Sequence, residues 1–512
     1  MRLLFPAAGI HAVRFRRSLN GFPAVGRMPL GAWGFCGNRG GHGAVGFTPA
    51  QGKHRTRRRA AMQPLMPIAR RERQGQKSII TALLQHYCRK ERKPSRSAEA
   101  GLQSMKKTVL RKYAQLIVNC GIHVQKGQEV IVRAELDQPE FVKMVVEEAY
   151  KSGAKKVTVE WSYQPLDKVH VRYRSLKTLS TVEKWEEERL KHRADTLPCM
   201  IYLVSEDPDG SRGMNQEKNA KSMQERYKII KPYRDAMENR YQWCIAAVPG
   251  AAWAKKLFPH ERTARAMEKL WEAILYTSRA TDDPVEAWKL HNADLEARYT
   301  YLNSLNLRYL RYKAGNGTDL TVGLIPDALF MGGGERTLGG DVFYNPNIPS
   351  EEVFVTPKRG EAEGIVYASK PLSYHGELIE NFSIRFRDGK AVEVHAEKNE
   401  ALLKRLISMD EGASYLGECA LVPFESPINQ SGILFYNTLF DENAVCHLAL
   451  GMGFTNCLKD FEKYTLAECR EKGINDSMIH EDFMIGTEDL SITGVTEDGK
   501  EIPIFRNGTW AF

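Results

Sequence analysis

The feature that most constrains this chain is a strand pattern, a helix pattern and a second strand pattern in succession between residues 129 and 161. The β-branched run EVIVRAE, from Glu129, predicts a buried strand, and KKVTVEW predicts another. Between them, Pro139 fits the first turn of a helix whose apolar residues recur at helical spacing. We expect Asp137 to cap this helix and Gly153 to end it. Such βαβ units build parallel sheets, so the sequence predicts an α/β domain.

The hydrophobic period changes further along the chain. The strand pattern WCIAAVP and the helix pattern ERTARAMEKLWEAILYT continue the α/β order, and a long amphipathic helix beginning at Asp283 and Pro284 is expected to lead into a second domain. Beyond it, LRYLRYKAGNGTDLTVGL, FSIRFRDGKAVEVHAE and LSITGVTEDGKEIPIF alternate with a period of two, which predicts antiparallel strand pairs. We therefore predict an α/β domain with a parallel sheet over residues 106–285 and a mostly antiparallel α+β domain over residues 286–512.

The formal charge of +10 comes from the first 104 residues. They hold 20 of the 73 Lys and Arg residues and 3 of the 63 acidic residues, which leaves 53 basic and 60 acidic residues in the rest of the chain. Rich in Arg and Gly and without a sustained period, residues 1–104 are predicted to be a disordered basic extension. This extension fits a transit peptide, a nucleic-acid-binding arm, or translated upstream sequence with Met105 as the working start. The abrupt change of composition favours the last interpretation. Basic clusters without interleaved aromatic residues are weak evidence for a nucleic-acid-binding arm, and the rest of the chain is mildly acidic, so we do not expect a nucleic-acid partner.

Membrane and disulfide patterns are missing from the sequence. No stretch reaches the roughly 18 consecutive apolar residues that span a bilayer, and no signal-peptide core follows Met1, so we expect no membrane partner. The nine cysteines form no CxxC pair and no regular framework, which favours a reduced, cytoplasmic location.

The Gly-rich stretch MGGGERTLGGD, residues 331–341, invites comparison with a phosphate-binding loop. It lacks the preceding βαβ strand and the helix N-terminus that would hold a phosphate. We therefore expect a flexible surface loop here.

Four stretches of the second domain place acids or histidines at the edges of apolar runs: NIPSEEVFVTP, GASYLGECALVPFESPI, LFDENAVCHLALGMGF and HEDFMIG. An ionisable group at such an edge is costly to desolvate unless it is paired or bound to a metal. Each motif alone also fits a strand-end carboxylate facing water, or a histidine bonded to a carbonyl. In HEDF, however, strand geometry puts His480 and Asp482 on one face and Glu481 on the other. An imidazole beside a carboxylate can hold a divalent ion such as Zn or Co.

In two of the other three motifs, spacing limits which residues can face a common site. Glu442 and His447 lie five residues apart and can converge only through a turn, because helical spacing would prefer four. Glu351 and Glu352 should alternate in an extended segment, so only one of them can face a given site.

Together, the four stretches resemble the metallo-aminopeptidases of the thermophilic type, the family of aminopeptidase T, aminopeptidase S and aminopeptidase II. The resemblance runs from Met105 to the end of the chain and leaves out residues 1–104. Single motifs are only moderately specific, whereas four in family order and near family spacing make a strong joint signal. The resemblance implies a hydrolase that removes N-terminal residues from peptides, with residues 286–512 as its metal-binding catalytic domain. It also implies a homodimer.

The resemblance assigns two divalent metal ions per subunit, Zn, Co or Mn, to six ligands: Glu352, Glu418, Glu442, His447, His480 and Asp482. Spacing between the motifs favours Glu352 over Glu351, and Glu418 or Asp482 are the natural bridges. Two such ions about 3.5–4 Å apart would activate a shared water and polarise the scissile carbonyl. One ion would also bind the free α-amino group of the substrate, which restricts cleavage to the first residue.

One position departs from the family pattern. The family usually has a tyrosine seven residues after the ligand histidine, where its hydroxyl can stabilise the oxyanion, and this sequence has Phe454 there. Losing one such donor typically costs roughly 2.7–4 kcal/mol. We therefore assign no catalytic residue, and name Glu351 as a candidate proton carrier and Tyr436 as a candidate replacement for the hydroxyl.

Two other classes of function stay open. Phe454 is compatible with a catalytically weakened homologue that binds peptide or metal without efficient turnover. Residues 1–104 are compatible with a basic-arm interaction protein.

Overall fold

A computed structural model of the chain describes residues 107–280, 282–338 and 342–512. The expectations for residues 1–104, and for Met105 as the working start, lie outside the described residues. No helix in the described part of the chain is long and apolar enough to cross a membrane.

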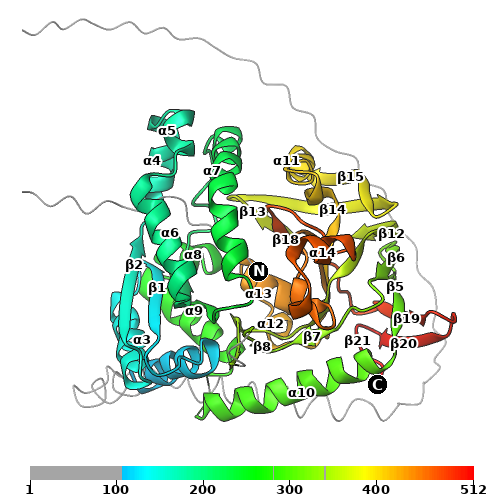
Figure 1. Cartoon of the computed structure of the whole chain (residues 1–512), viewed down its shortest axis with the longest axis horizontal. Coiled ribbons are helices and arrows are strands. Elements are labelled where there is room, and N and C mark those ends of the chain that lie inside the picture. Colours follow the sequence, from blue (N-terminus) through cyan, green and yellow to red (C-terminus); the bar gives the residue numbers. More distant parts are fainter. Residues whose placement is uncertain (1–106, 281, 339–341) are drawn as a thin grey trace, which may run out of the picture. The chain divides into compact units, whose positions relative to one another are not determined.

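A parallel sheet organises the first half of the described chain (Figure 1). Its strands lie in the order β10-β4-β3-β1-β2, and every neighbouring pair is parallel. The strands are β1 Glu129–Glu135, β2 Lys156–Ser162, β3 Cys199–Val204, β4 Trp243–Ala247 and β10 Asn347–Ile348. The predicted parallel sheet is confirmed, although β10 is supplied from beyond residue 285.

Helices pack on both faces of this sheet. Val130 and Val132 of β1 join the large apolar cluster that includes residues of helices α3, Pro139–Lys151, and α9, Thr263–Thr277. Ile131 packs on the other face with Met237 of helix α7, Gln216–Met237. A helical segment over residues 107–116 continues into the π-helix Ile117–Gly121. The later helices are α3 Pro139–Lys151, α4 Pro165–Tyr173, α5 Leu176–Ser180, α6 Lys184–Thr196, α7 Gln216–Met237, α8 Ala251–Leu257 and α9 Thr263–Thr277.

The start of α3 differs from the sequence expectation. The helix begins at Pro139 and ends near Gly153 as predicted, but Gln138 is its N-cap residue and no side chain caps it. Asp137 instead accepts a hydrogen bond from Oγ of Ser205 at 2.8 Å. The prediction that Asp137 caps α3 is therefore wrong, because its carboxylate has a partner across the sheet rather than in its own helix.

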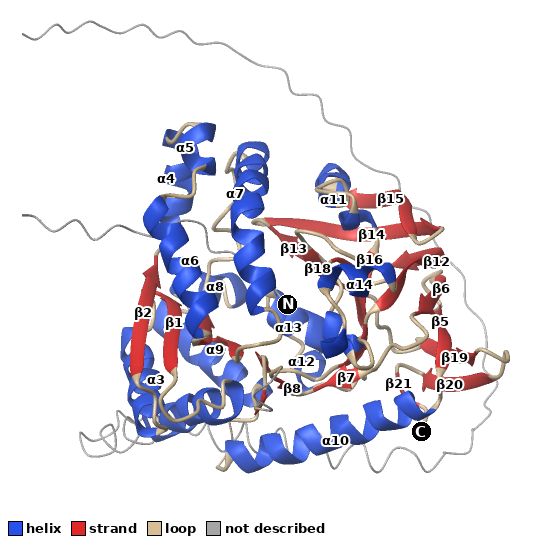
Figure 2. Cartoon of the chain, viewed as in Figure 1, coloured by secondary structure: helices blue, strands red, loops and turns tan. Residues whose placement is uncertain are grey.

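Helix α10, Pro284–Ser304, leads from the parallel sheet into the β-rich half, as Figure 2 shows. The side chain of Asp283 accepts a hydrogen bond from the backbone N–H of Glu286 at 3.1 Å, which confirms the predicted helix start. Trp288 is completely buried, and its indole N–H donates to the carbonyl of Ser278 at 2.8 Å. These contacts attach α10 to the end of α9.

The β-rich half contains a nine-stranded antiparallel sheet in the order β13-β14-β12-β6-β5-β19-β20-β21, with β15 paired to β14. The predicted strand pairs are confirmed, and turns at Asp388-Gly389 and Asp498-Gly499 connect two of them. The strands are β5 Leu307–Lys313, β6 Asp319–Leu324, β12 Pro357–Tyr367, β13 Leu372–Tyr374, β14 Glu377–Arg387, β15 Lys390–Lys398, β19 Ser491–Thr496, β20 Glu501–Arg506 and β21 Thr509–Trp510.

A second, smaller antiparallel sheet, which we call the site sheet, has the order β18-β17-β16-β11-β7. Its strands are β7 Met331–Gly332, β11 Val353–Val355, β16 Leu416–Leu421, β17 His447–Gly451 and β18 His480–Met484. The short helices of this half are α11 Glu400–Leu406, α12 Pro427–Gln430, α13 Thr438–Asp441 and α14 Leu466–Glu471, with 3-10 turns at Gly412–Ser414, Glu442–Ala444, Thr455–Cys457 and Phe461–Lys463.

The Gly-rich stretch does not form a surface loop over its described residues. Met331 and Gly332 pair with β11, and Glu335–Arg336 forms β8, which pairs with β9, Phe343–Tyr344. A Cβ added to Gly332 would lie 2.6 Å from the carbonyl oxygen of Glu352, so the backbones approach too closely for a side chain. The surface-loop prediction is wrong here because these glycines serve close packing between strands.

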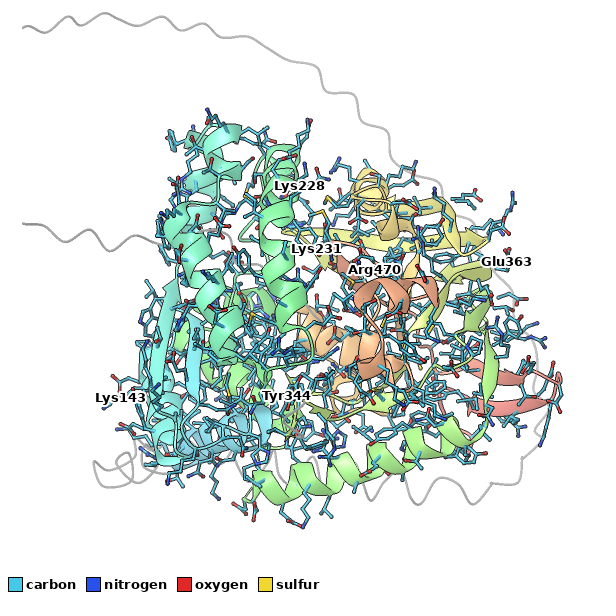
Figure 3. The ribbon with its side chains drawn as sticks, in the orientation of Figure 1. Lys143, Lys228, Lys231, Tyr344, Glu363 and Arg470 are labelled. Carbon is cyan, nitrogen blue, oxygen red and sulfur yellow. The ribbon has the colours of Figure 1, made fainter. Side chains whose placement is uncertain are left out.

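Ion pairs connect helix α7 to the segment that precedes β18. Nζ of Lys231 lies 3.3 Å from Oδ1 of Asp476, and Nη2 of Arg470, in α14, lies 3.2 Å from the same oxygen. Figure 3 labels both basic side chains at this junction. Because all three side chains are partly exposed, these ion pairs add little to the free energy of unfolding. Their main effect is to align α7 and α14 with the segment before β18.

Candidate metal centre

The site sheet carries its polar residues on one face. The register pairs Glu418 of β16 with Ala449 of β17, and Ala449 with Asp482 of β18, so these three side chains form a row on the same side. His447 and His480 each lie two residues from a member of this row, and therefore project from the same face. The predicted shared face of His480 and Asp482 is confirmed by this register.

The opposite face of the site sheet packs into an apolar core. Cys419, Leu448 and Phe483 alternate with the polar residues and belong to the apolar cluster shared with the nine-stranded sheet. Period-two alternation therefore places the acids and histidines on one side and the core residues on the other. Both sides are covered, which explains why β16 and β17 are buried along their whole length.

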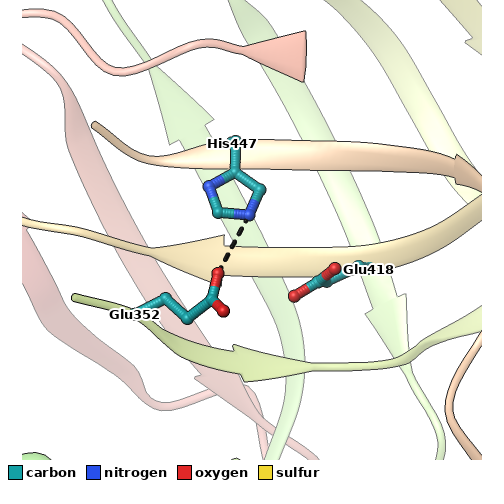
Figure 4. A group of neighbouring side chains, drawn as sticks. All are labelled: Glu352, Glu418 and His447. Carbon is teal, nitrogen blue, oxygen red and sulfur yellow. Dashed lines mark ion pairs between the residues drawn. The ribbon is translucent and has the colours of Figure 1, made fainter. Parts of the chain in front are cut away.

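Figure 4 shows the first group of clustered side chains, Glu352, Glu418 and His447. Glu352 directly precedes β11, and its Oε2 lies 3.2 Å from Nε2 of His447. The same nitrogen lies 3.7 Å from Oδ1 of Asp482. His447 is 0% exposed and Glu352 2% exposed, so water does not screen this contact.

His480 forms the centre of a second group. Its Nε2 lies 3.0 Å from Oε2 of Glu418 and 3.5 Å from Oδ1 of Asp482. Glu442, in the 3-10 turn before β17, joins His447 and Asp482 in a third group. Within each group the potential ligand atoms lie within 4.8 Å of one another. The structure thus brings together all six residues that the family resemblance singled out.

Both imidazoles are turned so that Nε2 faces the carboxylates. Nδ1 of His480 lies 2.7 Å from the carbonyl oxygen of Met452, and Nδ1 of His447 lies 3.4 Å from that of Val445. A carbonyl oxygen only accepts, so Nδ1 is the nitrogen that carries the proton. This arrangement presents the Nε2 lone pair to the carboxylate cluster, as is usual for histidines that bind metals.

The carboxylates perturb the protonation of both histidines. Burial lowers the pKa of His480, but the neighbouring Asp482 and Glu418 carboxylates outweigh burial and raise it to about 9. Burial likewise opposes a charge on His447, and Glu352 and Asp482 still raise its pKa above the usual value. The cluster therefore attracts positive charge strongly.

The donor set fits divalent metal ions. When both imidazoles are neutral, as metal binding requires, the four carboxylates and two imidazoles carry a formal charge of −4 in a cluster in which no side chain is more than 3% exposed. Such buried charge needs compensation by cations. Oε1 of Glu418 is buried and has no hydrogen-bond partner within the described chain, which suits a metal ligand. Carboxylate oxygen and imidazole nitrogen are ligands that Zn, Co and Mn accept.

Phe454 lies directly beside this cluster. Its ring centroid is 4.9 Å from that of His480 and 5.4 Å from that of Phe354. Phe454 also lines a small cavity of about 20 Å³ together with Glu352 and Glu418. The position at which the family pattern has a tyrosine is thus adjacent to the candidate ligands.

Glu351 and Tyr436, the two candidate catalytic residues named from the sequence, lie in different parts of the structure. Glu351 is 6% exposed and faces away from the cluster, where Arg279 binds its carboxylate through both outer nitrogens, one at 2.7 Å. Tyr436 has a left-handed backbone with φ of 54°, held because Asp441 accepts hydrogen bonds from the N–H groups of Phe435 and Asn437. Tyr436 lines the large cavity described next.

A cavity of about 490 Å³ borders the cluster. Its lining includes His480 and Tyr436 of the β-rich half and an acidic wall of Glu135, Asp167 and Glu206 from the α/β region. Glu135 and Glu206 stand at the carboxyl ends of β1 and β3, where the strand order of the parallel sheet reverses, which is the usual ligand crevice of such sheets. Sequence reasoning missed this wall, because nothing in the spacing of these residues relates them to the second half.

A family match, curated relatives and a solved structure all relate this chain to the same group of proteins. The chain matches the family described as thermophilic metalloprotease (M29) over residues 106–510. It is 40% identical to aminopeptidase AmpS of Bacillus subtilis over 405 residues, which are 79% of this chain and 98% of that protein. It is 38% identical to aminopeptidase T of Thermus thermophilus over 78% of this chain and 98% of that protein. The solved structure of wild-type AmpT from Thermus thermophilus matches with a TM-score of 0.72 at 37% identity, covering 79% of this chain and 100% of that one.

Proposed function

Because this chain belongs to the thermophilic metalloprotease family (M29) and is therefore a peptide-bond hydrolase, we propose that it removes single residues from the N-terminus of peptides with the help of two bound divalent ions. The convergence of six carboxylate and imidazole side chains from five segments of the chain is the observation that supports this proposal most directly. The aminopeptidase names of its relatives support the choice of substrate end.

The charge of the cluster supports two ions rather than one. A single divalent cation would leave two of the four buried negative charges uncompensated, whereas two would neutralise them. Glu418 belongs both to the group with Glu352 and His447 and to the group with His480, and Asp482 belongs both to the group with His480 and to the group with Glu442. In this proposal Asp482 or Glu418 serves both ions. Zn, Co and Mn are the candidate metals.

The residues of the chain have distinct tasks in this proposal. Bound divalent ions would supply the acidity that activates water and polarises the scissile carbonyl. The carbonyl oxygens of Met452 and Val445 hold His480 and His447 in the tautomer that leaves Nε2 free for a metal. The cavity beside His480 has room for a short peptide, and its acidic wall attracts the positively charged N-terminus.

Glu351 has a different role from the proton carrier considered from sequence. Its carboxylate is occupied by Arg279 and turned away from the cluster. We infer that it anchors the segment that presents Glu352.

The proposal is tested by replacing His480, with His395 as a matched control. His395 has a side chain that is 72% exposed and lies outside the cluster. In assays of amino-acid amides and short peptides with added Co(II) or Zn(II), His480→Ala should lose both activity and bound metal while keeping its circular dichroism spectrum. His395→Ala should behave like the unmodified chain. Full activity of His480→Ala would rule the proposal out.

A catalytically weakened homologue is the second candidate function, and Phe454 is the observation that favours it. A ring without a hydroxyl beside His480 cannot donate a hydrogen bond to a developing oxyanion. Retained metal without measurable hydrolysis of any peptide would support this alternative.

A further inference from the structure

Asn443 lies between two segments that carry clustered carboxylates. It follows Glu442 in the 3-10 turn Glu442–Ala444, and it is 0% exposed. Its side-chain Nδ2 donates to Oε1 of Glu442 at 3.0 Å and to the carbonyl oxygen of Leu439 at 3.0 Å. Its Oδ1 accepts from the backbone N–H of Glu351 at 2.8 Å.

These partners determine the orientation of the amide. The N–H of Glu351 can only donate, so it must face Oδ1, whereas the carbonyl of Leu439 and the carboxylate of Glu442 must face Nδ2. Both N–H groups of Asn443 are used, and a flipped amide would break all three hydrogen bonds. Asn443 therefore holds Glu442 and the backbone of residue 351 in one arrangement.

Two further side chains hold residues 350 and 351, next to the backbone N–H that Asn443 binds. Arg279, which follows the end of α9, binds the carboxylate of Glu351, and Nε2 of His291 lies 2.7 Å from the carbonyl oxygen of Ser350. With residues 350 and 351 anchored, the next residue, Glu352, reaches within 3.2 Å of Nε2 of His447.

We propose that Asn443 is a positioning residue for the metal centre, which fixes Glu442 and Glu352 relative to each other across 90 residues of sequence. This inference rests on the proposed function, because it assumes that both carboxylates bind metal. Without the amide, the carboxylate of Glu442 regains rotamer freedom and the N–H of Glu351 loses its partner. A bound cation must then order both groups itself, and its affinity falls.

The matched control for this proposal is Asn475. It is also 0% exposed, and its Nδ2 also donates two hydrogen bonds, to the carbonyl oxygens of Gly412 at 2.8 Å and Gly451 at 2.6 Å. None of these bonds reaches a candidate ligand side chain. Asn443→Ala and Asn475→Ala therefore both remove two buried donors, but only the first releases a carboxylate of the cluster.

The experiment titrates the full-length chain and both variants, stripped of metal, with Co(II) against a chromophoric chelator, and records the visible absorption of bound Co(II). Both variants should melt at lower temperature than the unmodified chain. Asn443→Ala should also bind Co(II) about 10- to 100-fold more weakly and show an altered spectrum. Losses of this size are usual when a group that hydrogen-bonds a metal ligand is removed. Asn475→Ala should keep the affinity and the spectrum.

Unchanged Co(II) affinity in Asn443→Ala, or an equal loss in Asn475→Ala, would overturn the positioning role. An unmodified chain that binds no Co(II) would instead overturn the proposed function, so the two failures are distinguishable. If Asn443→Ala does not fold, Asn443→Ser replaces it, since a serine hydroxyl leaves a smaller void and can still meet the N–H of Glu351, but is too short to bond all three partners.

Discussion

Phe454 is the residue at which this chain departs from its family pattern, and its ring lies against that of His480. A hydroxyl added here by Phe454→Tyr would stand next to the candidate ligands. We expect kcat for peptide hydrolysis to rise by about 100- to 1000-fold, the range attributed to a single oxyanion donor. Metal content, measured by elemental analysis, should not change.

Phe354 provides the control for this substitution, because its ring is in edge contact with Phe454 but is not at the family position. Phe354→Tyr should leave kcat unchanged. If Phe454→Tyr has no effect and Tyr436→Phe abolishes activity, the donor comes from Tyr436 instead. That result would contradict our assignment of position 454.

At the scale of single residues, sequence reasoning succeeded where the geometry is local. The shared face of His480 and Asp482 follows from strand alternation alone. The alternation of Glu351 and Glu352 was equally readable, yet the burial of Glu351 against Arg279 was not, since the two residues are 72 positions apart. The role of Asn443 could not be predicted for the same reason, because it depends on Glu351, 92 positions away.

At the scale of elements, a small residue of β17 separates two of the candidate ligands. Ala449 is fully buried and lies between Glu418 and Asp482 in one row of the site sheet. Ala449→Leu would insert three carbon atoms between these carboxylates. We expect metal affinity to fall at least tenfold, together with an overpacking cost of about 1–3 kcal/mol in the free energy of unfolding.

Ala391 of β15 gives a control with the same change in size. It is 6% exposed and packs in the core of the nine-stranded sheet, away from the cluster. Ala391→Leu should reduce thermal stability in a comparable way while leaving Co(II) affinity unchanged in the chelator titration. Equal affinity in Ala449→Leu and the unmodified chain would show that the row does not determine the ligand spacing.

Long, strongly patterned elements were predicted well, and short ones were not. β1, α10 and the strand pairs closed by Asp-Gly turns agree with the sequence patterns, because each is specified by its own residues. β7 and β8 were mistaken for a surface loop. Two-residue strands have no period to detect, and the closeness of Gly332 to the backbone of Glu352 exists only in the folded chain.

At the scale of the whole molecule, the two halves meet at the cavity whose acidic wall includes Asp167 and Glu206. Burial, together with the nearby Glu135 carboxylate, raises the pKa of Glu206 to about 7. Burial and the charges of Glu135 and Glu206 raise the pKa of Asp167 to about 7 as well. The folded chain therefore keeps protons on Glu206, just after β3, and on Asp167 of α4 that an unfolded chain would release near pH 4.

This difference makes stability depend on pH. Between about pH 4 and pH 7 the unfolded chain binds fewer protons than the folded one at these sites, so their contribution to stability falls as pH rises and is fully unfavourable above pH 7. Glu206→Gln removes one such group. Its melting temperature should exceed that of the unmodified chain by several degrees at pH 8, corresponding to about 1–3 kcal/mol, and the gain should vanish near pH 4.

Glu462 is the control for this pH series, because it is exposed and has no ion pair or hydrogen bond through its side chain among the described contacts. Glu462→Gln should show no pH-dependent gain in differential scanning calorimetry. A constant difference between Glu206→Gln and the unmodified chain from pH 4 to pH 8 would contradict the raised pKa. The position of the wall itself could not be predicted, because it requires the relative placement of two sheets.

The central claim is that six side chains from separate segments hold a pair of divalent cations that the peptidase activity requires. Elemental analysis of the purified chain after dialysis against Zn(II) or Co(II) tests this claim most directly. The account predicts two equivalents of metal per chain, falling below one in His480→Ala and unchanged in His395→Ala. A chain that hydrolyses peptides with no bound metal, or that retains two equivalents in His480→Ala, would contradict it.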